Sequence, residues 1–408
     1  MTDDISIEVP TADEWPAFAS ALAYTFNEPN EEEVAEVERV IFEPERCLVA
    51  KREGEMVGTA GIFTRQLTVP GNMIPAGHVT FVSVNPTARR RGVLTRFMHR
   101  QFDDIIGAGE SIAVLWASEG RIYQRFGYGS ASRKLSFTIE SREISLVADP
   151  AETGRIRVGA PADLRDTLVK VFEQLVADRP GWSERSARHW DYRLADPSGW
   201  RRGATALRVA IHEGEHGPDG YVLFRVSSDW NQNGPANEVR VIETVAANPA
   251  AYASLWRFIL TIDLSRSATH RFAAVDEPLQ FMVNEPRRLG SQLSDALWLR
   301  ILDLPAALMG RRYATDVDLV LEVTDALRPS NAGRWRLTGS PTAARCVATD
   351  EPADLRCDIR VLGSVYLGGA PLTAYADAGQ VTEVRPGALA AASTAFGWHR
   401  SPSTLEVF

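Results

Sequence analysis

The chain has 408 residues, of which 45% are hydrophobic and 24% charged, which is typical of a globular protein with room for two or three domains. Its formal net charge of -9 argues against general nucleic-acid binding, which requires basic surface, and would suit a cationic substrate. The three cysteines (Cys47, Cys346 and Cys357) and the seven histidines show no metal-ligand spacing, so we expect buried, unpaired thiols and no metal site.

The N-terminal residues are acidic and lead directly into a short strand pattern. They contain neither the basic region nor the apolar core of a signal peptide, and no apolar run in the chain is long enough to span a bilayer. We therefore expect a cytoplasmic protein that has no membrane partner.

The first elements alternate between strand and helix patterns. Residues 5–9 alternate in polarity as a strand does, and Asp13 is the expected N-cap of a helix with an apolar face formed by Trp15, Phe18, Leu22 and Phe26. A short helix is predicted over residues 31–41. Residues 47–50 and 56–68 are predicted to form a hairpin that turns at residues 52–55.

A strand, a basic turn and a helix follow, and they are the most informative part of the chain. Residues 79–84 are β-branched and aromatic, Arg89-Arg90-Arg91-Gly92 forms the turn, and apolar residues then recur every three or four positions. Unpaired N–H groups at such a helix N-terminus, together with three arginines, favour a polyphosphate. The alternative is that the arginines only solvate a loop. A strand at 112–117, a short helix near Arg121 and a strand at 133–139 complete this part.

The same order of elements recurs about 150 residues later in a degenerate form. Residues 156–163 resemble residues 5–13, the segments 207–212 and 220–225 resemble the earlier hairpin, and Asn248-Pro249 precedes an apolar helix as Asn85-Pro86 does. The second copy has neither the arginine triplet nor the glycine at its turn. We interpret this as a duplicated fold in which only the first copy kept a phosphate-binding turn, although short strand–proline–helix patterns also match by chance.

From about Ser291 the pattern changes to strands at 298–301, 316–323, 334–339 and 346–348, interspersed with helices. The predicted organisation is therefore mixed α/β (α+β), with units at 1–150, 151–290 and 291–408. No low-complexity linker separates the units, so we expect them to pack tightly.

Three strings together indicate a family. They are the loop at residues 82–92, the string Ala117-Ser118-Glu119-Gly120-Arg121-Ile122-Tyr123-Gln124-Arg125-Phe126-Gly127-Tyr128-Gly129, and the ending Leu405-Glu406-Val407-Phe408. The chain closely resembles the enhanced-intracellular-survival (Eis) family of N-acetyltransferases in the GNAT superfamily. The resemblance implies a catalytic GNAT domain at 1–150, a degenerate GNAT domain at 151–290 and a sterol-carrier-protein-like domain at 291–408. Leu94 departs from the small residue that the superfamily usually has at the end of its acyl-CoA loop motif.

The resemblance also implies an acetyl-CoA site, with no metal. The implied cofactor-binding residues are Val82, Ser83, Val84, Arg89, Arg90, Arg91, Gly92, Val93, Leu94, Thr95, Ser118 and Glu119. Tyr123 corresponds to the family's general acid, the carboxylate of Phe408 to its general base, and Phe81 and Arg125 to the acceptor side. Glu28 or the glutamate run at 31–33 is a candidate substrate contact, against the alternative of a solvated face.

The two catalytic assignments each have an ordinary alternative. Tyr123 would otherwise be a core aromatic residue, and Phe408 a frayed chain end. A terminal carboxylate has an unperturbed pKa of about 3.5, against about 10 for an alkyl ammonium. Either a desolvated pocket raises the pKa of the carboxylate, or the carboxylate chiefly binds and orients the amine.

The leading functional hypothesis is acetyl-CoA-dependent N-acetylation of a primary amine on a polycationic small molecule, such as an aminoglycoside or a polyamine. Acetylation of lysine on proteins or peptides is a close alternative. A lipid-binding or scaffold protein with a vestigial transferase half is an alternative from another class, against which the intact arginine turn and Tyr123 argue. The resemblance further implies a homo-hexamer.

Overall fold

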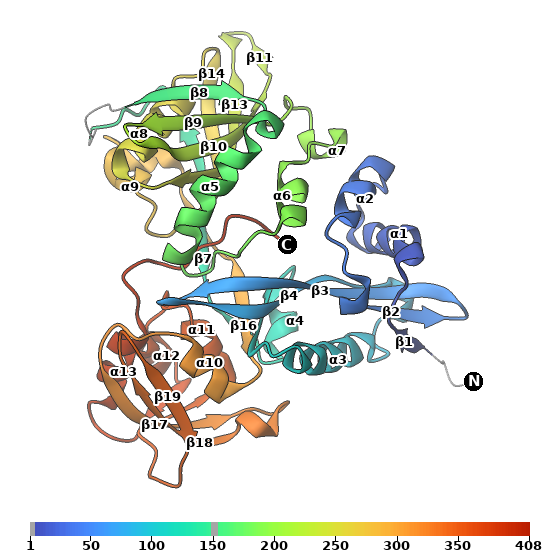
Figure 1. The fold of residues 1–408 in the computed structure, drawn as a ribbon, viewed down its shortest axis with the longest axis vertical. Helices are drawn as coiled ribbons and strands as arrows, with labels where there is room; N and C mark the ends of the chain where they lie inside the picture. The colour runs from blue at the N-terminus through green and yellow to red at the C-terminus, as the bar shows by residue number, and fades with distance from the viewer. Residues whose placement is uncertain (1–4, 148–153) are drawn as a thin grey trace.

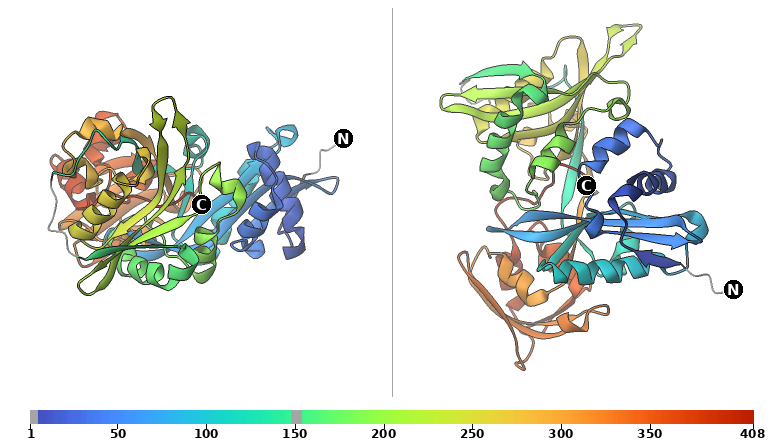
Figure 2. Two further views of the ribbon diagram at one scale, coloured as in Figure 1. Left: turned by 90° about the horizontal axis from the view of Figure 1, so that it is seen from above. Right: turned by 45° about the vertical axis from the view of Figure 1, so that its right-hand side comes forward.

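The computed structural model describes residues 5–147 and 154–408 and arranges them in three units, each built on one β-sheet (Figure 1). The predicted boundary at 150/151 lies outside the described residues. In Figure 1 the first sheet lies in the middle, the second unit above it and the third below it. The C-terminus lies at the centre, beside α6 and the first sheet, and the right-hand view of Figure 2 agrees.

The first sheet has the strand order β1-β2-β3-β4-β5-β16-β6. Neighbours from β1 to β4 are antiparallel, whereas β5 runs parallel to β4. The bounds are β1 Ser6–Glu8, β2 Cys47–Arg52, β3 Glu55–Val69, β4 Asn72–Val84, β5 Ile112–Trp116, β6 Gly129–Ser130 and β16 Leu297–Ile301. The helices of this unit are α1 Trp15–Phe26, α2 Glu32–Arg39, α3 Val93–Gly107 and α4 Gly120–Gln124.

The first helix begins differently from the sequence-based prediction. Asp13 was the expected N-cap, but it lies inside a 3-10 turn, Ala12–Glu14, that precedes α1. The Glu14 carboxylate instead accepts a hydrogen bond from the Thr11 N–H at 2.9 Å. The Thr11-x-x-Glu14 pair therefore caps this end, as a capping box does.

The second sheet repeats the plan of the first, in the order β15-β7-β14-β13-β10-β9-β8. Its parallel pair, β13 with β14, corresponds to β4 with β5. The bounds are β7 Arg133–Glu140, β8 Arg155–Gly159, β9 Arg208–Gly214, β10 Gly217–Ser227, β13 Asn237–Ala246, β14 Ser265–Ala273 and β15 Gln292–Asp295. A small ribbon pairs β11 Trp230–Asn231 with β12 Gly234–Pro235. The helices are α5 Arg165–Leu175, α6 Ala187–Leu194, α7 Ser198–Arg201, α8 Pro249–Leu260 and α9 Leu279–Met282.

The two duplicated sheets exchange their last strands, which the sequence analysis did not predict. The strand expected to close the first unit, β7, pairs with β14 and β15 in the second sheet. In return, β16, which was expected in the third unit, pairs with β5 and β6 in the first sheet. Each sheet is thus completed by a strand from elsewhere in the chain, so the two sheets are tied together by main-chain hydrogen bonds.

The third unit has a five-stranded sheet in the order β19-β18-β17-β20-β21. The bounds of its elements are α10 Leu304–Gly310, β17 Val317–Thr324, β18 Gly333–Gly339, β19 Ala344–Ala348, β20 Leu355–Asp358, α11 Ile359–Val365, α12 Leu372–Asp377, β21 Val381–Glu383 and α13 Ala388–Phe396. Its apolar core is continuous with residues of the first sheet such as Leu67 and Val114. The expectation of tight packing between units is confirmed.

Two other expectations can be compared with the structure. Cys47, Cys346 and Cys357 are free and buried, as predicted. Within the described parts of the chain, none of the helices combines the length and the apolar character needed to cross a membrane.

Candidate active site

The end of β4 forms one wall of the candidate site because β4 and β5 diverge there. The two parallel strands are in register only at Gly77 with Ala113 and His78 with Val114. Beyond this point β4 is bulged opposite β3, and Phe81 has a left-handed φ of 54°. The divergence leaves the β4 edge at residues 82–84 facing a cavity rather than a neighbouring strand.

The arginine turn and the start of α3 form the opposite wall. Arg90 and Gly92 have φ values of 64° and 75°, a conformation that glycine adopts without strain. In the described chain no side chain caps α3, whose first main-chain bond runs from the Arg96 N–H to the Gly92 carbonyl. The amides of the first helical turn, residues 93–95, are thus available to a ligand, and the helix dipole and the arginines favour an anion.

These walls enclose a cavity of about 690 Å³. Of the sixteen predicted site residues, thirteen line it: Val82, Ser83, Val84, Arg89, Arg90, Gly92, Val93, Leu94, Thr95, Ser118, Glu119, Tyr123 and Arg125. Five further residues line the cavity and were not predicted from the sequence: Thr25, Phe26, Asn27, Ala88 and Ile122. Ala88 and Ile122 directly adjoin predicted residues, whereas Thr25, Phe26 and Asn27 lie at the end of α1, just before the candidate substrate contact Glu28.

Three predicted residues do not line this cavity. Arg91 is exposed and is not among the residues that line the cavity. Phe81 turns into an aromatic cluster beneath α1, with ring centroids 5.7 Å from Phe18 and 5.3 Å from Phe63. Phe408 packs its ring 4.7 Å from the ring of His78, upstream of the β4 bulge.

Tyr123 lies in α4 and is 6% exposed. Burial raises the pKa of its phenol to about 12, so the group stays protonated at neutral pH. Its ring packs against that of Tyr128, with 5.9 Å between centroids. Tyr123 is therefore a fixed, protonated hydroxyl that faces the cavity.

His78 cannot serve as a strong base beside Phe408. Burial, and then the charge of Arg65, lower its pKa to about 3. Its Nδ1 lies 2.9 Å from the Ala76 carbonyl and therefore carries the hydrogen, so Nε2 accepts from the Ser183 hydroxyl at 2.7 Å. His78 is thus neutral, and its ring supports that of Phe408.

Ion pairs fix the last residues of the chain between the first two units. The Glu406 carboxylate lies 2.8 Å from Arg65 of β3 and 2.9 Å from Arg185 of the second unit. Arg185 also donates to both carboxylate oxygens of the buried Glu243. Burial raises the pKa of Glu406, but Arg185 and Arg65 outweigh this effect and hold the pKa well below its usual range. Glu406 is therefore ionised at neutral pH, and the tail is anchored by charge.

Further carboxylates lie near the tail. Burial, and then the charge of Glu28, raise the pKa of Glu38 to about 7. The charges of Glu38, Glu406 and Glu28 also contribute, after burial, to a raised pKa at Tyr192 in α6. The carboxylates of Glu38, Glu406 and Glu28 therefore all lie near the Tyr192 side chain. Of the predicted glutamate run, Glu33 instead accepts hydrogen bonds from the Ser198 N–H and hydroxyl.

Within the described residues, no group of three or more potential ligands (His, Cys, Asp or Glu) could hold a metal ion. The site instead combines an anion-binding turn, a strand edge and a protonated phenol. This arrangement suits a phosphate-bearing ligand.

Comparisons with known proteins agree with this geometry. Two different family models, each described as "Acetyltransferase (GNAT) domain", match residues 6–131 and 181–301, and a sterol carrier protein domain model matches residues 304–404. The chain is 40% identical to an uncharacterized N-acetyltransferase of Streptomyces avermitilis, over 97% of each chain. It is 33% identical to the N-acetyltransferase Eis of Mycobacterium tuberculosis, over 88% of each.

Solved structures are similar over the whole length. The crystal structure of Eis1 from Mycobacterium abscessus has a TM-score of 0.83 at 32% identity and covers 99% of this chain and 100% of its own. A GCN5-related N-acetyltransferase from Anabaena variabilis has a TM-score of 0.86 at 20% identity with the same coverage, which is a likeness of fold.

Proposed function

Because this chain belongs to the Eis family of GNAT N-acetyltransferases, we propose that it transfers the acetyl group of acetyl-CoA to a primary amine of a polycationic small molecule, such as an aminoglycoside or a polyamine. The observation that carries the proposal is the single cavity that joins the arginine turn, the β4 edge and Tyr123. The corresponding turn of the second unit lacks the arginines and the glycine.

The residues of this cavity fit the parts of acetyl-CoA. Arg89, Arg90 and the first-turn amides of α3 would bind the pyrophosphate, which carries the negative charge. The β4 edge at residues 82–84 would pair with the amides of the pantetheine arm as a neighbouring strand would. Ser118 and Glu119, at the end of β5, would contact the arm from the other side of the divergence.

The proposed reaction is direct transfer. The neutral amine attacks the thioester carbonyl, a C–N bond forms and the C–S bond breaks. The Val82 N–H, in the β4 bulge, would stabilise the oxyanion of the tetrahedral intermediate. The Tyr123 hydroxyl would give its proton to the leaving thiolate. A phenol with a pKa of about 12 is fully protonated before this step, as a general acid must be.

We assign the base role to the terminal carboxylate of Phe408, which would accept or direct the proton that leaves the amine. Its support is the anchoring of the tail: Arg65 and Arg185 hold Glu406, and His78 packs on the Phe408 ring. A chain end held in this way is not the frayed terminus that is usual. We also assign Phe81 and Arg125 to the acceptor side. Phe81 packs in the aromatic cluster beside the β4 bulge, and Arg125 lines the cavity.

The carboxylates near the tail support a cationic acceptor. Glu28 follows the cavity-lining residues of α1, and its charge acts on Glu38. A second ammonium group of the acceptor would favour the ionised form of Glu38 and offset the repulsion between the two glutamates.

The test is release of CoA thiol from acetyl-CoA with a panel of amines. We expect turnover with polyamines or aminoglycosides that exceeds turnover with lysine-containing peptides. The reverse order would favour the lysine N-acetyltransferase alternative. Absence of thiol release with every amine of the panel would favour the scaffold alternative. The packed interior of the third unit, including Arg311, Tyr313 and Phe396, argues against that alternative.

We also propose a homo-hexamer, on the family resemblance. Light scattering at micromolar concentration should report six chains per particle, and a monomer alone would contradict the proposal.

A further inference from the structure

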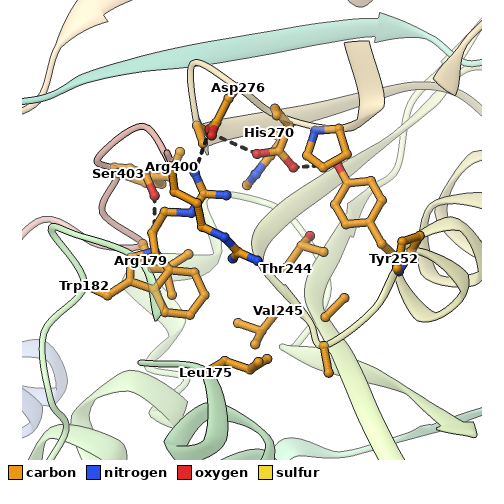
Figure 3. Close-up of a pocket in the computed structure, with 18 of the residues that line it drawn as sticks. Leu175, Arg179, Trp182, Thr244, Val245, Tyr252, His270, Asp276, Arg400 and Ser403 are labelled. Atoms are coloured by element: carbon orange, nitrogen blue, oxygen red, sulfur yellow. Dashed lines mark hydrogen bonds and ion pairs between the residues drawn. The ribbon is translucent and has the colours of Figure 1, made fainter. Parts of the chain in front are cut away.

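The second unit contains its own cavity, of about 380 Å³, in the position that corresponds to the active-site cavity (Figure 3). The parallel strands β13 and β14 pair from Asn237 with Ser265 to Val241 with His270, with one register shift after Asn237. Beyond that point the strands diverge, and the cavity lies between residues 244–247 and residues 270–274, beside the start of α8. The tail closes it, with Arg400, Ser403 and Leu405 in its wall.

This cavity is not built for a second acetyl-CoA. The side chain of Asn248 caps α8 by accepting from the Ala251 N–H at 2.9 Å, and Pro249 at the first position has no N–H to offer. The helix terminus that corresponds to the proposed phosphate site of the first unit is therefore capped here by residues of the chain itself. The cavity keeps the space between the strands but not the phosphate site.

Most of its charged groups are already paired. Arg179 donates to Asp276 at 2.6 Å and to the Ser401 carbonyl at 2.9 Å. Glu277 accepts from the Tyr252 hydroxyl and from the Ala274 N–H. Arg400 is the exception: it is an exposed residue whose side chain extends from the tail into the open side of the cavity, and no ion pair or hydrogen bond to another described residue engages it (Figure 3).

Two buried polar atoms of the cavity wall also have no partner among the described residues: Thr244 Oγ1 and His270 Nδ1. His270 is 3% exposed, and burial lowers its pKa, so the ring is neutral. A buried polar group without a hydrogen bond costs about 1–3 kcal/mol, so such groups commonly have a partner that is a ligand or water. Apolar side chains make up much of the remaining wall: Leu175, Trp182, Val245, Phe272, Met282 and Leu405.

We propose that this cavity binds a small monocarboxylic acid with an apolar body. The carboxylate would pair with the Arg400 guanidinium and accept from the Thr244 hydroxyl, and the apolar body would cover the wall. A single unpaired guanidinium matches the charge and the two oxygens of one carboxylate. A phosphate carries more charge and would need donors that the capped helix does not supply. The acid would lie against the tail, which contributes Arg400, Ser403 and Leu405 to the wall.

The test is calorimetry of the full-length protein with hexanoate and phenylacetate. The matched neutral probes are hexanamide and phenylacetamide, and inorganic phosphate tests the anion class. We expect saturable binding of at least one carboxylate at millimolar concentration. The Kd values of the amide and of phosphate should be at least about tenfold higher, the change expected when one charge-assisted hydrogen bond is lost. No carboxylate binding, or equal binding of carboxylate and amide, would overturn the proposal.

Two variants locate the site. Arg400→Gln should raise the carboxylate Kd at least about tenfold and leave acetyl-CoA binding unchanged, because Arg400 is remote from the arginine turn in the sequence and lines only the second cavity. Arg90→Ala should instead raise the acetyl-CoA Kd and leave the carboxylate Kd unchanged. Carboxylate binding that responds to Arg90→Ala and not to Arg400→Gln would place the ligand in the first cavity and refute the proposal. Thr244→Val, a near-isosteric change, should weaken binding as well.

Discussion

Glu406 Oε1 lies 2.8 Å from the Arg65 guanidinium, and this contact joins the third residue from the end of the chain to β3 of the first sheet. The Arg65 side chain is 2% exposed and the Glu406 side chain 17% exposed. Arg65 also donates to the carbonyls of Glu184 and Ser183, which belong to the second unit. The path of the tail is therefore fixed by a charge pair at the place where the first two units meet.

Replacement of Glu406 by Gln should destabilise the protein and reduce turnover. Arg65 would lose the carboxylate with which it forms an ion pair among the described residues and would keep a buried charge. Removing one partner of a buried pair typically costs about 3–5 kcal/mol. Thermal unfolding and thiol-release kinetics would measure the two effects. Acetyl-CoA affinity should not change, because Glu406 does not line that cavity.

The matched control is Glu351→Gln, which removes an ion pair of similar length, 2.7 Å to Arg336, where the Glu351 side chain is 51% exposed. Exposed pairs contribute less than about 1 kcal/mol. If Glu406→Gln were as mild as this control, the tail would not be held by its charge.

Glu38 should give the acceptor site a pH dependence. Its pKa in the folded protein, about 7, is higher than the value of about 4.3 expected in the unfolded chain. A carboxyl with a raised pKa contributes stability that is lost as the pH rises through the folded value. From pH 6 to pH 8, Glu38→Gln should therefore gain about 1 kcal/mol of stability relative to the wild type.

The same titration should affect acceptor binding in the opposite sense. As Glu38 ionises, its charge favours a polycation, so the KM for a polyamine should fall between pH 6 and pH 8 more in the wild type than in Glu38→Gln. A monoamine acceptor is the control, because it has no second ammonium group. Parallel pH profiles of the two proteins would exclude Glu38 from the acceptor site.

The sequence predicted many local elements, but the prediction failed where strands that are distant in the chain pair with one another. The turn at residues 89–92 and Tyr123 lie close together in the chain, so their common cavity follows from one strand–turn–helix and the strand beside it. The exchange of β7 and β16 between sheets leaves no local signal, because both strands have the pattern of any half-buried strand. Arg65 and Arg185, which pair with Glu406, were likewise not predicted, because both lie far from Glu406 in the sequence.

Arg90 and Arg91 should differ in their effect on acetyl-CoA binding. Arg90 lines the cavity, with a left-handed φ of 64°, whereas its neighbour does not line it. Calorimetry should give one acetyl-CoA site per chain, and Arg90→Ala should raise the Kd about tenfold or more, as expected for the loss of a charge-assisted hydrogen bond. Arg91→Ala is the matched control and should change the Kd less. Two sites per chain, or undiminished binding after both substitutions together, would contradict the assignment of the turn.

The final prediction concerns the carboxylate at the end of the chain. Addition of one or a few residues after Phe408 turns that carboxylate into an amide, which cannot accept a proton at neutral pH. The Phe408 ring can keep its place against His78, and the Arg65–Glu406 pair lies upstream, so folding and acetyl-CoA binding should persist. Turnover should fall by roughly 10²–10⁴-fold, the loss typical of a general base.

Tyr123→Phe is the matched comparison, because it tests the proposed general acid whereas the C-terminal extension tests the proposed base. It removes only the hydroxyl of a buried ring that packs on Tyr128, so the fold and the cavity should remain and turnover should fall by a similar factor. If the extended protein kept full activity while Tyr123→Phe lost it, the acid role of Tyr123 would stand and the base would be a water molecule or one of the nearby glutamates. Full activity in both variants would remove both residues from the proposed mechanism.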